Sequence, residues 1–224
     1  MKKRILAALL CVAVLCPRGV FAKTGKWVAL TFDDGPSGRY TRRLLDGLQS
    51  RGVTATFLLC GYRMKEYPQI AQRIFRDGHE IGLHGYSHQY MGKMTAAQVK
   101  KELSDTRALL PKGCQPVFFR PPGGVVTEAV KQASKEQGVA LLGWSVDPKD
   151  WAVKDAQAVE AAVLADVEDG DIILLHDMSD SSVDAALAIV DKLLEWGFRV
   201  VTASQLAQRR GITPKAGRLY FDFR

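Results

Sequence analysis

The sequence is poor in cysteine and contains no apolar run long enough to span a membrane. Of its 224 residues only four are cysteine, and two of these, Cys11 and Cys16, fall among the first 22. So few cysteines do not support a small disulfide-built scaffold. The clearest apolar run, residues 5–15, is too short for a transmembrane helix. We therefore expect one globular domain with a sizeable core and no transmembrane anchor.

Basic runs and stripes of alternating basic and aromatic residues are also missing. The formal net charge of +7 includes four basic residues and no acid from the first 22 positions, namely Lys2, Lys3, Arg4 and Arg18. Without that segment the charge is +3. Such a mild excess gives no reason to expect a nucleic-acid partner.

The N-terminal segment has the pattern of a secretory signal. Three basic residues precede the apolar run, and Val20-Phe21-Ala22 offers a small-residue cleavage site. Neither Cys11 nor Cys16 follows the small residues that a lipoprotein signal requires. We expect a signal peptide over residues 1–22, a single catalytic domain over 23–224, and export to the periplasm or the extracellular space as a monomer.

Short apolar runs alternate with amphipathic stretches through the rest of the chain. The expected strands are 27–32, 54–59, 80–83, 117–119, 139–146, 172–175 and 199–202. Helical patterns lie between them; one begins with the capping box Thr95 to Gln98, and another is opened by Ser181. Parallel neighbours need crossover helices, so this alternation predicts a parallel α/β sheet. The pattern alone leaves a barrel and an open doubly wound sheet both possible.

Adjacent carboxylates, Asp33 and Asp34, end the first expected strand just before Gly35-Pro36. Like charges this close are costly unless a cation or a proton offsets them. Other polar residues also follow strand ends, where α/β folds bind ligands. They are His84, His88, Arg120, Asp147, Asp150, His176 and Asp177. Their clustering predicts one site at the carboxyl ends of the strands.

The two histidines His84 and His88 lie four residues apart just after the third expected strand. Zinc and similar metals favour imidazole with carboxylate, and a catalytic site keeps three protein ligands. Asp34 would complete that set. His79 begins its strand, so we expect it at the opposite end of the sheet, with a structural role.

Five short segments resemble the motifs of one family. In chain order they are Thr31-Phe32-Asp33-Asp34-Gly35-Pro36, His84-Gly85-Tyr86-Ser87-His88, Arg120-Pro121-Pro122-Gly123-Gly124, Asp147-Pro148-Lys149-Asp150-Trp151 and Leu174-Leu175-His176. They are similar to the motifs of the polysaccharide deacetylases, the NodB-homology domain of carbohydrate esterase family 4. The resemblance covers roughly residues 27–206. It implies a distorted (β/α) barrel of about seven parallel strands and metal-dependent removal of N-acetyl groups from sugars.

The resemblance also implies roles for the residues around the metal. Asp34, His84 and His88 would be its ligands, and Asp33 would be the general base. Zinc is expected, although the same ligands suit cobalt, nickel or iron. The backbone N–H of Gly123 would stabilise the oxyanion.

A second group of roles concerns the proton donor and the acetyl group. His176 would be the general acid, and Asp150 is expected to contact Arg120 and set the charge of His176. Arg120 would orient Asp33. Trp151 and Leu174 would form the wall of the acetyl pocket, although either could equally be an ordinary core residue.

Two further expectations concern Gly85 and the two cysteines after the N-terminal segment. The family usually has Ser or Thr where Gly85 stands, so we expect a more mobile loop and a modestly weaker metal affinity. Cys60 and Cys114 are expected near opposite ends of the sheet, too far apart for a disulfide.

The substrate is expected to be an N-acetylated envelope polysaccharide, peptidoglycan first and chitin oligomers next. The alternatives are a metal hydrolase of the same fold acting on another amide or an ester, and a sugar-binding module without turnover. An aspartyl-phosphate phosphatase fits poorly, because adjacent acids do not reproduce its Asp-x-Asp spacing.

Overall fold

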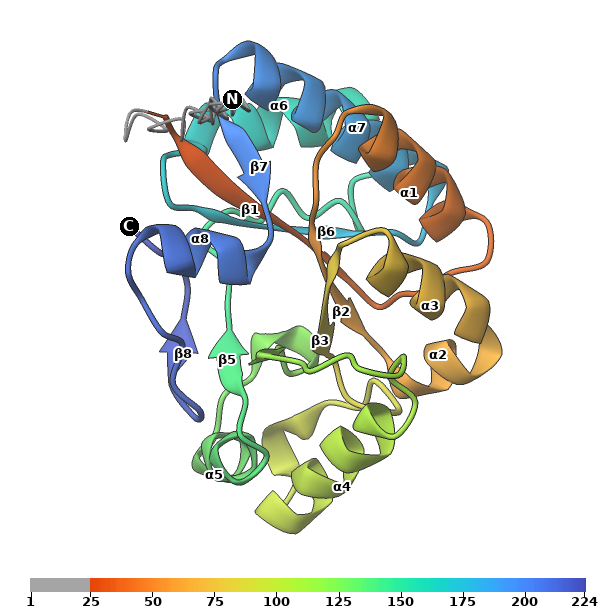
Figure 1. The fold of residues 1–224 in the computed structure, drawn as a ribbon, viewed down its shortest axis with the longest axis vertical. Helices are drawn as coiled ribbons and strands as arrows, with labels where there is room; N and C mark the ends of the chain where they lie inside the picture. Colours follow the sequence, from red (N-terminus) through yellow and green to blue (C-terminus); the bar gives the residue numbers. More distant parts are fainter. Residues whose placement is uncertain (1–24) are drawn as a thin grey trace, which may run out of the picture.

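A computed structural model describes residues 25–224, so the expected signal peptide at 1–22 lies outside the described residues. The strands form one parallel sheet in the order β6-β1-β2-β3-β4-β5-β8, and β7 also pairs with β1 (Figure 1). The strands are β1 (Trp27–Asp33), β2 (Thr56–Leu59), β3 (Glu80–Leu83), β4 (Phe118–Phe119), β5 (Ala140–Leu142), β6 (Ile172–His176), β7 (Arg199–Val201) and β8 (Leu219–Tyr220).

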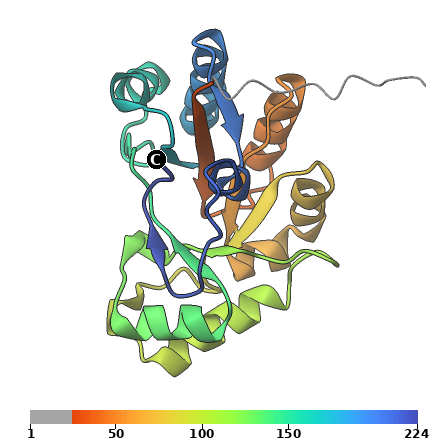
Figure 2. The ribbon, with the colours of Figure 1, turned by 60° about the vertical axis from the view of Figure 1, so that its left-hand side comes forward.

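The seven expected strands are confirmed, and β8 is an eighth that the sequence pattern did not reveal. It has two residues and pairs with β5 in parallel. The fifth expected strand is longer than β5, because the chain leaves the sheet after Leu142 and only Val146 returns, in an isolated bridge to Ile173. The sheet curls into an incomplete barrel (Figure 2).

Helices cover the outside of this sheet. They are α1 (Tyr40–Ser50), α2 (Gly61–Glu66), α3 (Pro68–Arg76), α4 (Ala96–Arg107), α5 (Glu128–Glu136), α6 (Ala156–Asp166), α7 (Asp180–Glu195) and α8 (Ala203–Arg209). The capping box of α4 at Thr95 and Gln98 is present. The expected start of α7 at Ser181 is wrong by two residues, because the side chain of Ser179 accepts the hydrogen bond from the Ser182 N–H.

The core is apolar on both faces of β1, which explains why its sequence is almost continuously hydrophobic. Phe32 and Phe57 stack at 5.2 Å between ring centroids inside this core. Cys60 and Cys114 are buried and free, as the expected separation implied. Within residues 25–224 we find no helix with the length and apolar character of a membrane span.

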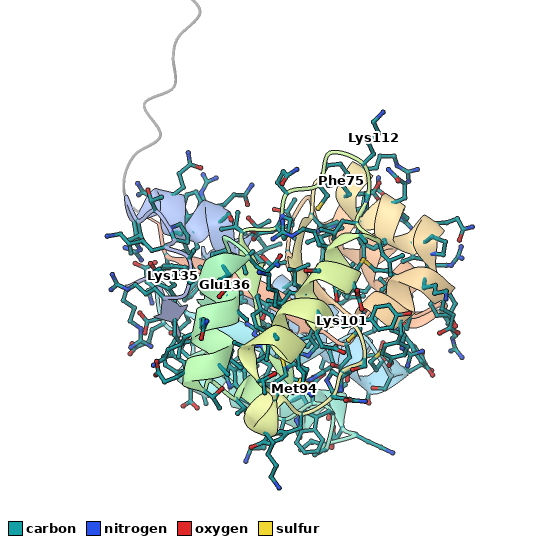
Figure 3. The ribbon with its side chains drawn as sticks, turned by 90° about the horizontal axis from the view of Figure 1, so that it is seen from below. Phe75, Met94, Lys101, Lys112, Lys135 and Glu136 are labelled. Atoms are coloured by element: carbon teal, nitrogen blue, oxygen red, sulfur yellow. The ribbon has the colours of Figure 1, made fainter. Side chains whose placement is uncertain are left out.

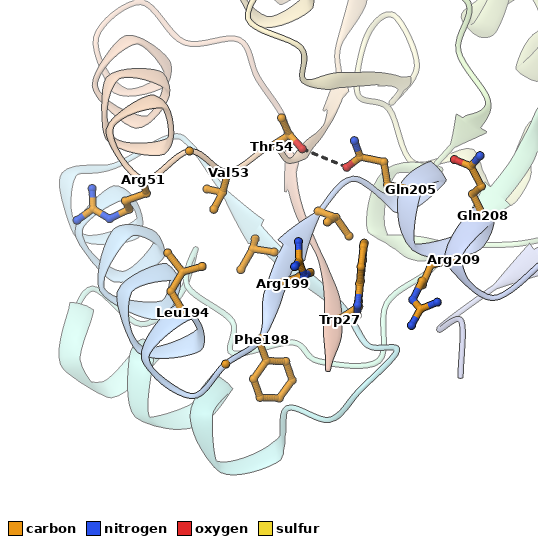
Figure 4. A pocket seen from close by; sticks show the side chains of 14 residues that line it. Trp27, Arg51, Val53, Thr54, Leu194, Phe198, Arg199, Gln205, Gln208 and Arg209 are labelled. Atoms are coloured by element: carbon orange, nitrogen blue, oxygen red, sulfur yellow. Dashed lines mark hydrogen bonds between the residues drawn. The ribbon is translucent and has the colours of Figure 1, made fainter. Parts of the chain in front are cut away.

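The two ends of the barrel differ in what lines them. At the amino ends of β1 and β7 lies a hollow of about 880 Å³, bordered by Trp27, Arg199 and Arg209 (Figure 4). No residue of the expected site lines it. His79 also lies at this end, buried, with its Nδ1 accepting a hydrogen bond from the Ala55 N–H. The expected site must therefore be sought at the carboxyl ends.

Candidate active site

The first strand brings the two adjacent acids to the carboxyl end of the sheet. Asp33 is the last residue of β1, and its register partner on β6 is His176. Asp34 follows in a left-handed conformation with φ of 72°, which turns its side chain away from the direction of Asp33. One acid thus remains part of the sheet edge, and the other faces the loop after β3.

Asp34, His84 and His88 converge at this edge. Their potential ligand atoms all lie within 4.8 Å of one another. Asp34 Oδ1 lies 3.2 Å from His84 Nε2 and 2.9 Å from His88 Nε2. His84 Nδ1 is 2.7 Å from the carbonyl oxygen of Arg120. A carbonyl only accepts, so Nδ1 carries a proton, and Nε2 is the ring nitrogen that faces Asp34.

The donor set fits a divalent cation. Although Asp34 Oδ1 is close to both imidazoles, neither approach has hydrogen-bond geometry, so this buried oxygen has no hydrogen-bond partner. Burial raises the pKa of Asp34, but the two imidazoles outweigh burial and hold the pKa well below its usual range. An ionised, unsatisfied carboxylate between two imidazoles is the environment that borderline metals prefer.

Asp33 is held by Arg120. The Arg120 side chain is fully buried, and its Nη1 donates to Asp33 Oδ1 at 2.7 Å and to Thr31 Oγ1 at 2.9 Å. Its other hydrogen bonds go to the carbonyl oxygens of Leu142 and Gly143. All three guanidinium nitrogens therefore donate to groups of β1 or of the end of β5, which fixes the orientation of the side chain. The Asp33 carboxylate is oriented through one oxygen, which leaves Oδ2 without a bond to Arg120.

His176 is paired with Asp150. Its Nδ1 lies 2.8 Å from Asp150 Oδ1, and its backbone N–H donates to Oδ2 at 2.9 Å. Burial alone would lower the pKa of His176, but Asp150 and the nearby carboxylates of Asp33 and Asp34 raise it to about 9. The imidazole is thus protonated at neutral pH.

The expected contact between Asp150 and Arg120 is wrong. Among the described residues, the hydrogen bonds of Arg120 go to Asp33, Thr31 and two carbonyls, and those of Asp150 go to His176. Asp33 with Arg120 and Asp150 with His176 therefore form two separate ion pairs, and no contact between Asp150 and Arg120 links them.

These groups open into one pocket of about 400 Å³. Eight of the ten expected site residues line it: Asp33, Asp34, His84, His88, Gly123, Trp151, Leu174 and His176. Arg120 and Asp150 lie behind them, fully or almost fully buried. Trp151 is 63% exposed at the rim, which excludes an ordinary core role, whereas Leu174 is buried.

Trp144 and Gly124 also line the pocket, and the sequence reasoning missed both. A Cβ on Gly124 would lie 2.5 Å from the Trp144 ring, so glycine is needed for the indole to reach the pocket. Arg120 lies over the same ring, at 5.4 Å from its centroid. Trp144 follows β5, but the expected strand 139–146 placed it inside the sheet, so the rule of strand ends could not identify it.

The loop at Gly85 has restraints other than a hydroxyl at position 85, while its mobility and its metal affinity stay predictions. The carboxylate of Glu102 on α4 accepts hydrogen bonds from the backbone N–H groups of Tyr86 and Ser87, at 2.7 and 2.8 Å. Gly85 itself has φ of +81°, and a Cβ there would lie 2.7 Å from Met91 Cε. The positive φ favours glycine at this position.

Comparisons with known proteins identify the family of this chain. The family model described as polysaccharide deacetylase matches residues 22–142. A peptidoglycan-N-acetylglucosamine deacetylase of Bacillus cereus is 37% identical, over 81% of this chain and 88% of its own length. The peptidoglycan-N-acetylmuramic acid deacetylase PdaC of Bacillus subtilis is 36% identical, over 82% of this chain but 39% of its own length.

Among solved structures, a family 4 acetyl xylan esterase from Clostridium thermocellum, in complex with a cobalt ion, superposes with a TM-score of 0.82. It is 34% identical, and the match covers 88% of this chain and 98% of that one. The chain therefore has the incomplete (β/α) barrel fold of carbohydrate esterase family 4. It belongs to the polysaccharide deacetylase family.

Proposed function

We propose that this protein uses a bound divalent cation to remove N-acetyl groups from the sugars of an envelope polysaccharide. The observation that carries the proposal is the arrangement of three units around one pocket. Asp34 Oδ1, which has no hydrogen-bond partner, faces two imidazoles; on either side lie an acid held by Arg120 and an imidazole held by Asp150. Peptidoglycan is the first candidate substrate, because that is what the names of the Bacillus relatives state, and chitin oligomers come next.

Asp34, His84 and His88 would hold the cation, and zinc is the metal that we propose for this donor set. Such a cation, when bound, polarises an amide carbonyl and makes water more acidic. Cobalt, nickel and iron suit the same ligands. Two proton transfers remain, one from the attacking water and one to the leaving nitrogen, and different residues would carry them out.

Asp33 would accept the proton of the attacking water. Arg120 holds Asp33 Oδ1, while Oδ2 lies 3.7 Å from His84 Nε2 and thus beside the expected metal position. A base must lie within reach of the proton that it removes, and Oδ2 has this position. The water oxygen bonds to the acetyl carbon, and its proton passes to Asp33.

His176 would donate a proton to the sugar nitrogen as the C–N bond breaks, because an amine leaves poorly without one. Acetate and a free amino sugar result. The backbone N–H of Gly123 would donate to the oxyanion, and Leu174 and Trp151 would enclose the acetyl methyl group. A sugar-binding module without turnover is disfavoured, because none of these groups is missing from the chain.

An ester substrate is the second candidate. The acetyl xylan esterase that superposes on this chain is the observation that favours it. The same base and acid could act on an O-acetyl group, and the residues outside the acetyl pocket would then decide the substrate.

Release of acetate tests the proposal. The zinc-loaded protein is incubated with peptidoglycan, with N-acetylglucosamine oligomers and with acetylated xylan, and free acetate is measured. We expect acetate from peptidoglycan or the oligomers. Acetate from xylan alone would replace the amide with the ester, and acetate from none of the three, with zinc bound, would contradict the hydrolase.

Asp33→Asn gives the matched variant for the same assay. We expect it to bind zinc as tightly as the wild type and to lose at least about 100-fold in kcat, because it keeps the shape of the carboxylate but not its basicity. Zinc content after dialysis and acetate release measure the two properties separately. Loss of zinc from this variant would contradict the division of labour between Asp33 and Asp34.

We also propose export as a monomer to the periplasm or the extracellular space, which the pattern of residues 1–22 supports. N-terminal sequencing of protein recovered outside the cytoplasm should begin near Lys23. An uncut N-terminus in that fraction would contradict it.

A further inference from the structure

Three residues, Gly85, Tyr86 and Ser87, separate the two imidazoles of the expected metal site, and one carboxylate binds this segment. Glu102 Oε2 accepts from the N–H groups of Tyr86 and Ser87 at 2.7 and 2.8 Å. Glu102 Oε1 accepts from the Ser87 hydroxyl at 2.9 Å. Three donors of a five-residue loop therefore converge on a single side chain from α4.

The backbone at Gly85 makes this convergence possible. A left-handed residue followed by ordinary residues turns successive N–H groups toward one point, which forms a small anion-binding concavity. Gly85 has φ of +81°, and a Cβ on it would lie 3.3 Å from Glu102 Oε2. The absence of a side chain at position 85 therefore leaves room for the Glu102 carboxylate beside the loop.

The other side of the loop is held by α2. The N–H groups of Gly61 and Tyr62 donate to the carbonyl oxygens of Gly85 and Tyr86, each at 3.0 Å. His88 follows directly after this segment with φ of +58°. A non-glycine residue in this conformation persists only where the surroundings hold it. Helices α2 and α4 together supply that restraint.

We infer that Glu102 is a positioning residue for the metal centre: its carboxylate holds the loop so that His88 reaches the same point as Asp34 and His84. The inference rests on the proposed metal site. It explains how this chain orders the loop without a hydroxyl at position 85. Loss of a residue that orients a metal ligand weakens metal affinity by about 10- to 100-fold.

The test is a zinc titration of metal-free protein against a chromophoric chelator, without substrate. Glu102→Ala should weaken zinc binding by about 10- to 100-fold. Glu102→Gln keeps an oxygen that can accept from both N–H groups, so its affinity should lie between those of Glu102→Ala and the wild type. The control is Glu136→Gln on the neighbouring helix α5 (Figure 3). Glu136 contacts Lys100 and Gln132, away from the loop, so its variant should bind zinc like the wild type.

Melting of the metal-free proteins separates positioning from a merely structural role. If Glu102→Ala lowers the melting temperature but binds zinc like the wild type, the inference is overturned. If Glu102→Ala does not fold, wild-type zinc affinity in Glu102→Gln overturns it instead. Absence of acetate release from the wild type would contradict the proposed function and leave the zinc comparison unaffected.

Discussion

At the scale of single residues, each reactive group of the site is joined to a partner of opposite charge. Arg120 fixes one oxygen of Asp33, and Asp150 fixes the imidazole of His176. Both partners are almost fully buried, so these pairs are shielded from the screening that weakens surface ion pairs. The fold thus sets the orientation of the base and the charge of the acid.

Replacing Asp150 by Asn should move the pH range of activity. The pKa of His176 is raised to about 9, so the imidazole keeps its proton below that pH and loses it above. Without the Asp150 carboxylate the pKa falls, and the alkaline limb of kcat/KM should move to lower pH. A pH–rate profile measures this shift.

Asp147→Asn provides the control for that profile. Asp147 lies in the same loop, is exposed, and accepts from the Lys149 N–H rather than from His176. The alkaline limb of kcat/KM in Asp147→Asn should stay at the same pH as in the wild type, even if kcat changes. An unmoved limb in Asp150→Asn would mean that another group sets it.

The strand pattern predicted where these residues lie, but how they pair was expected only from the family resemblance. The rule that polar residues follow strand ends places Asp33, His84, Arg120 and His176 at one edge of the sheet. It contains no information on side-chain direction, so the link between Asp150 and His176 came from the family resemblance, which also implied a contact between Asp150 and Arg120 that the structure does not contain. The sequence did not predict a role for Glu102, because it lies in a helix, where most glutamates are ordinary solvent-facing residues.

At the scale of elements, the start of β3 carries a buried titratable group. His79 accepts a hydrogen bond from the Ala55 N–H and packs edge-on against Phe57. Burial lowers the pKa of His79 to about 4. As the pH falls, His79 therefore becomes protonated at a lower pH in the folded protein than in the unfolded chain.

Stability should consequently decrease on acidification from about pH 6.5 toward pH 4. The His79 contribution is fully present above the unfolded pKa of about 6.5, and its loss amounts to roughly 2 to 3 kcal/mol. His79→Asn can still accept from Ala55, so it should show a smaller decrease, even if it is less stable at pH 7. Urea denaturation at pH 7 and 4.5 measures both, and equal decreases would contradict the assignment.

The expected elements agree with the structure where the pattern is long. The apolar run of β1 and the capping box of α4 are strong local signals. The short β8 is not visible in the sequence, because two residues cannot show an alternation and its pairing with β5 depends on chain closure. The start of α7 was misplaced because Ser179, Ser181 and Ser182 are all plausible caps.

At the scale of the whole molecule, the expected metal site connects distant parts of the chain. Asp34 follows β1, and His84 and His88 follow β3, with β2 between these strands in the sheet. A ligand that binds only the folded state stabilises it by mass action. Metal occupancy should therefore affect global stability as well as turnover.

Zinc at 100 times its Kd should add about 2.7 kcal/mol to the stability of the metal-free protein. For a domain of this size that corresponds to a rise of roughly 5 to 10 °C in Tm. Thermal melts with chelator and with zinc measure it. His88→Ala should show little of this rise, and a rise equal to that of the wild type would contradict the ligand set.

The two cysteines have a consequence for handling the protein. Burial raises the pKa of the Cys114 thiol to about 11, and the pKa of the Cys60 thiol is raised further, by burial and by the carboxylates of Asp34 and Asp33. Neither sulfur forms the reactive thiolate under ordinary conditions. Within residues 25–224 both cysteines are free, so reducing agents should leave the covalent framework of this part of the chain unchanged.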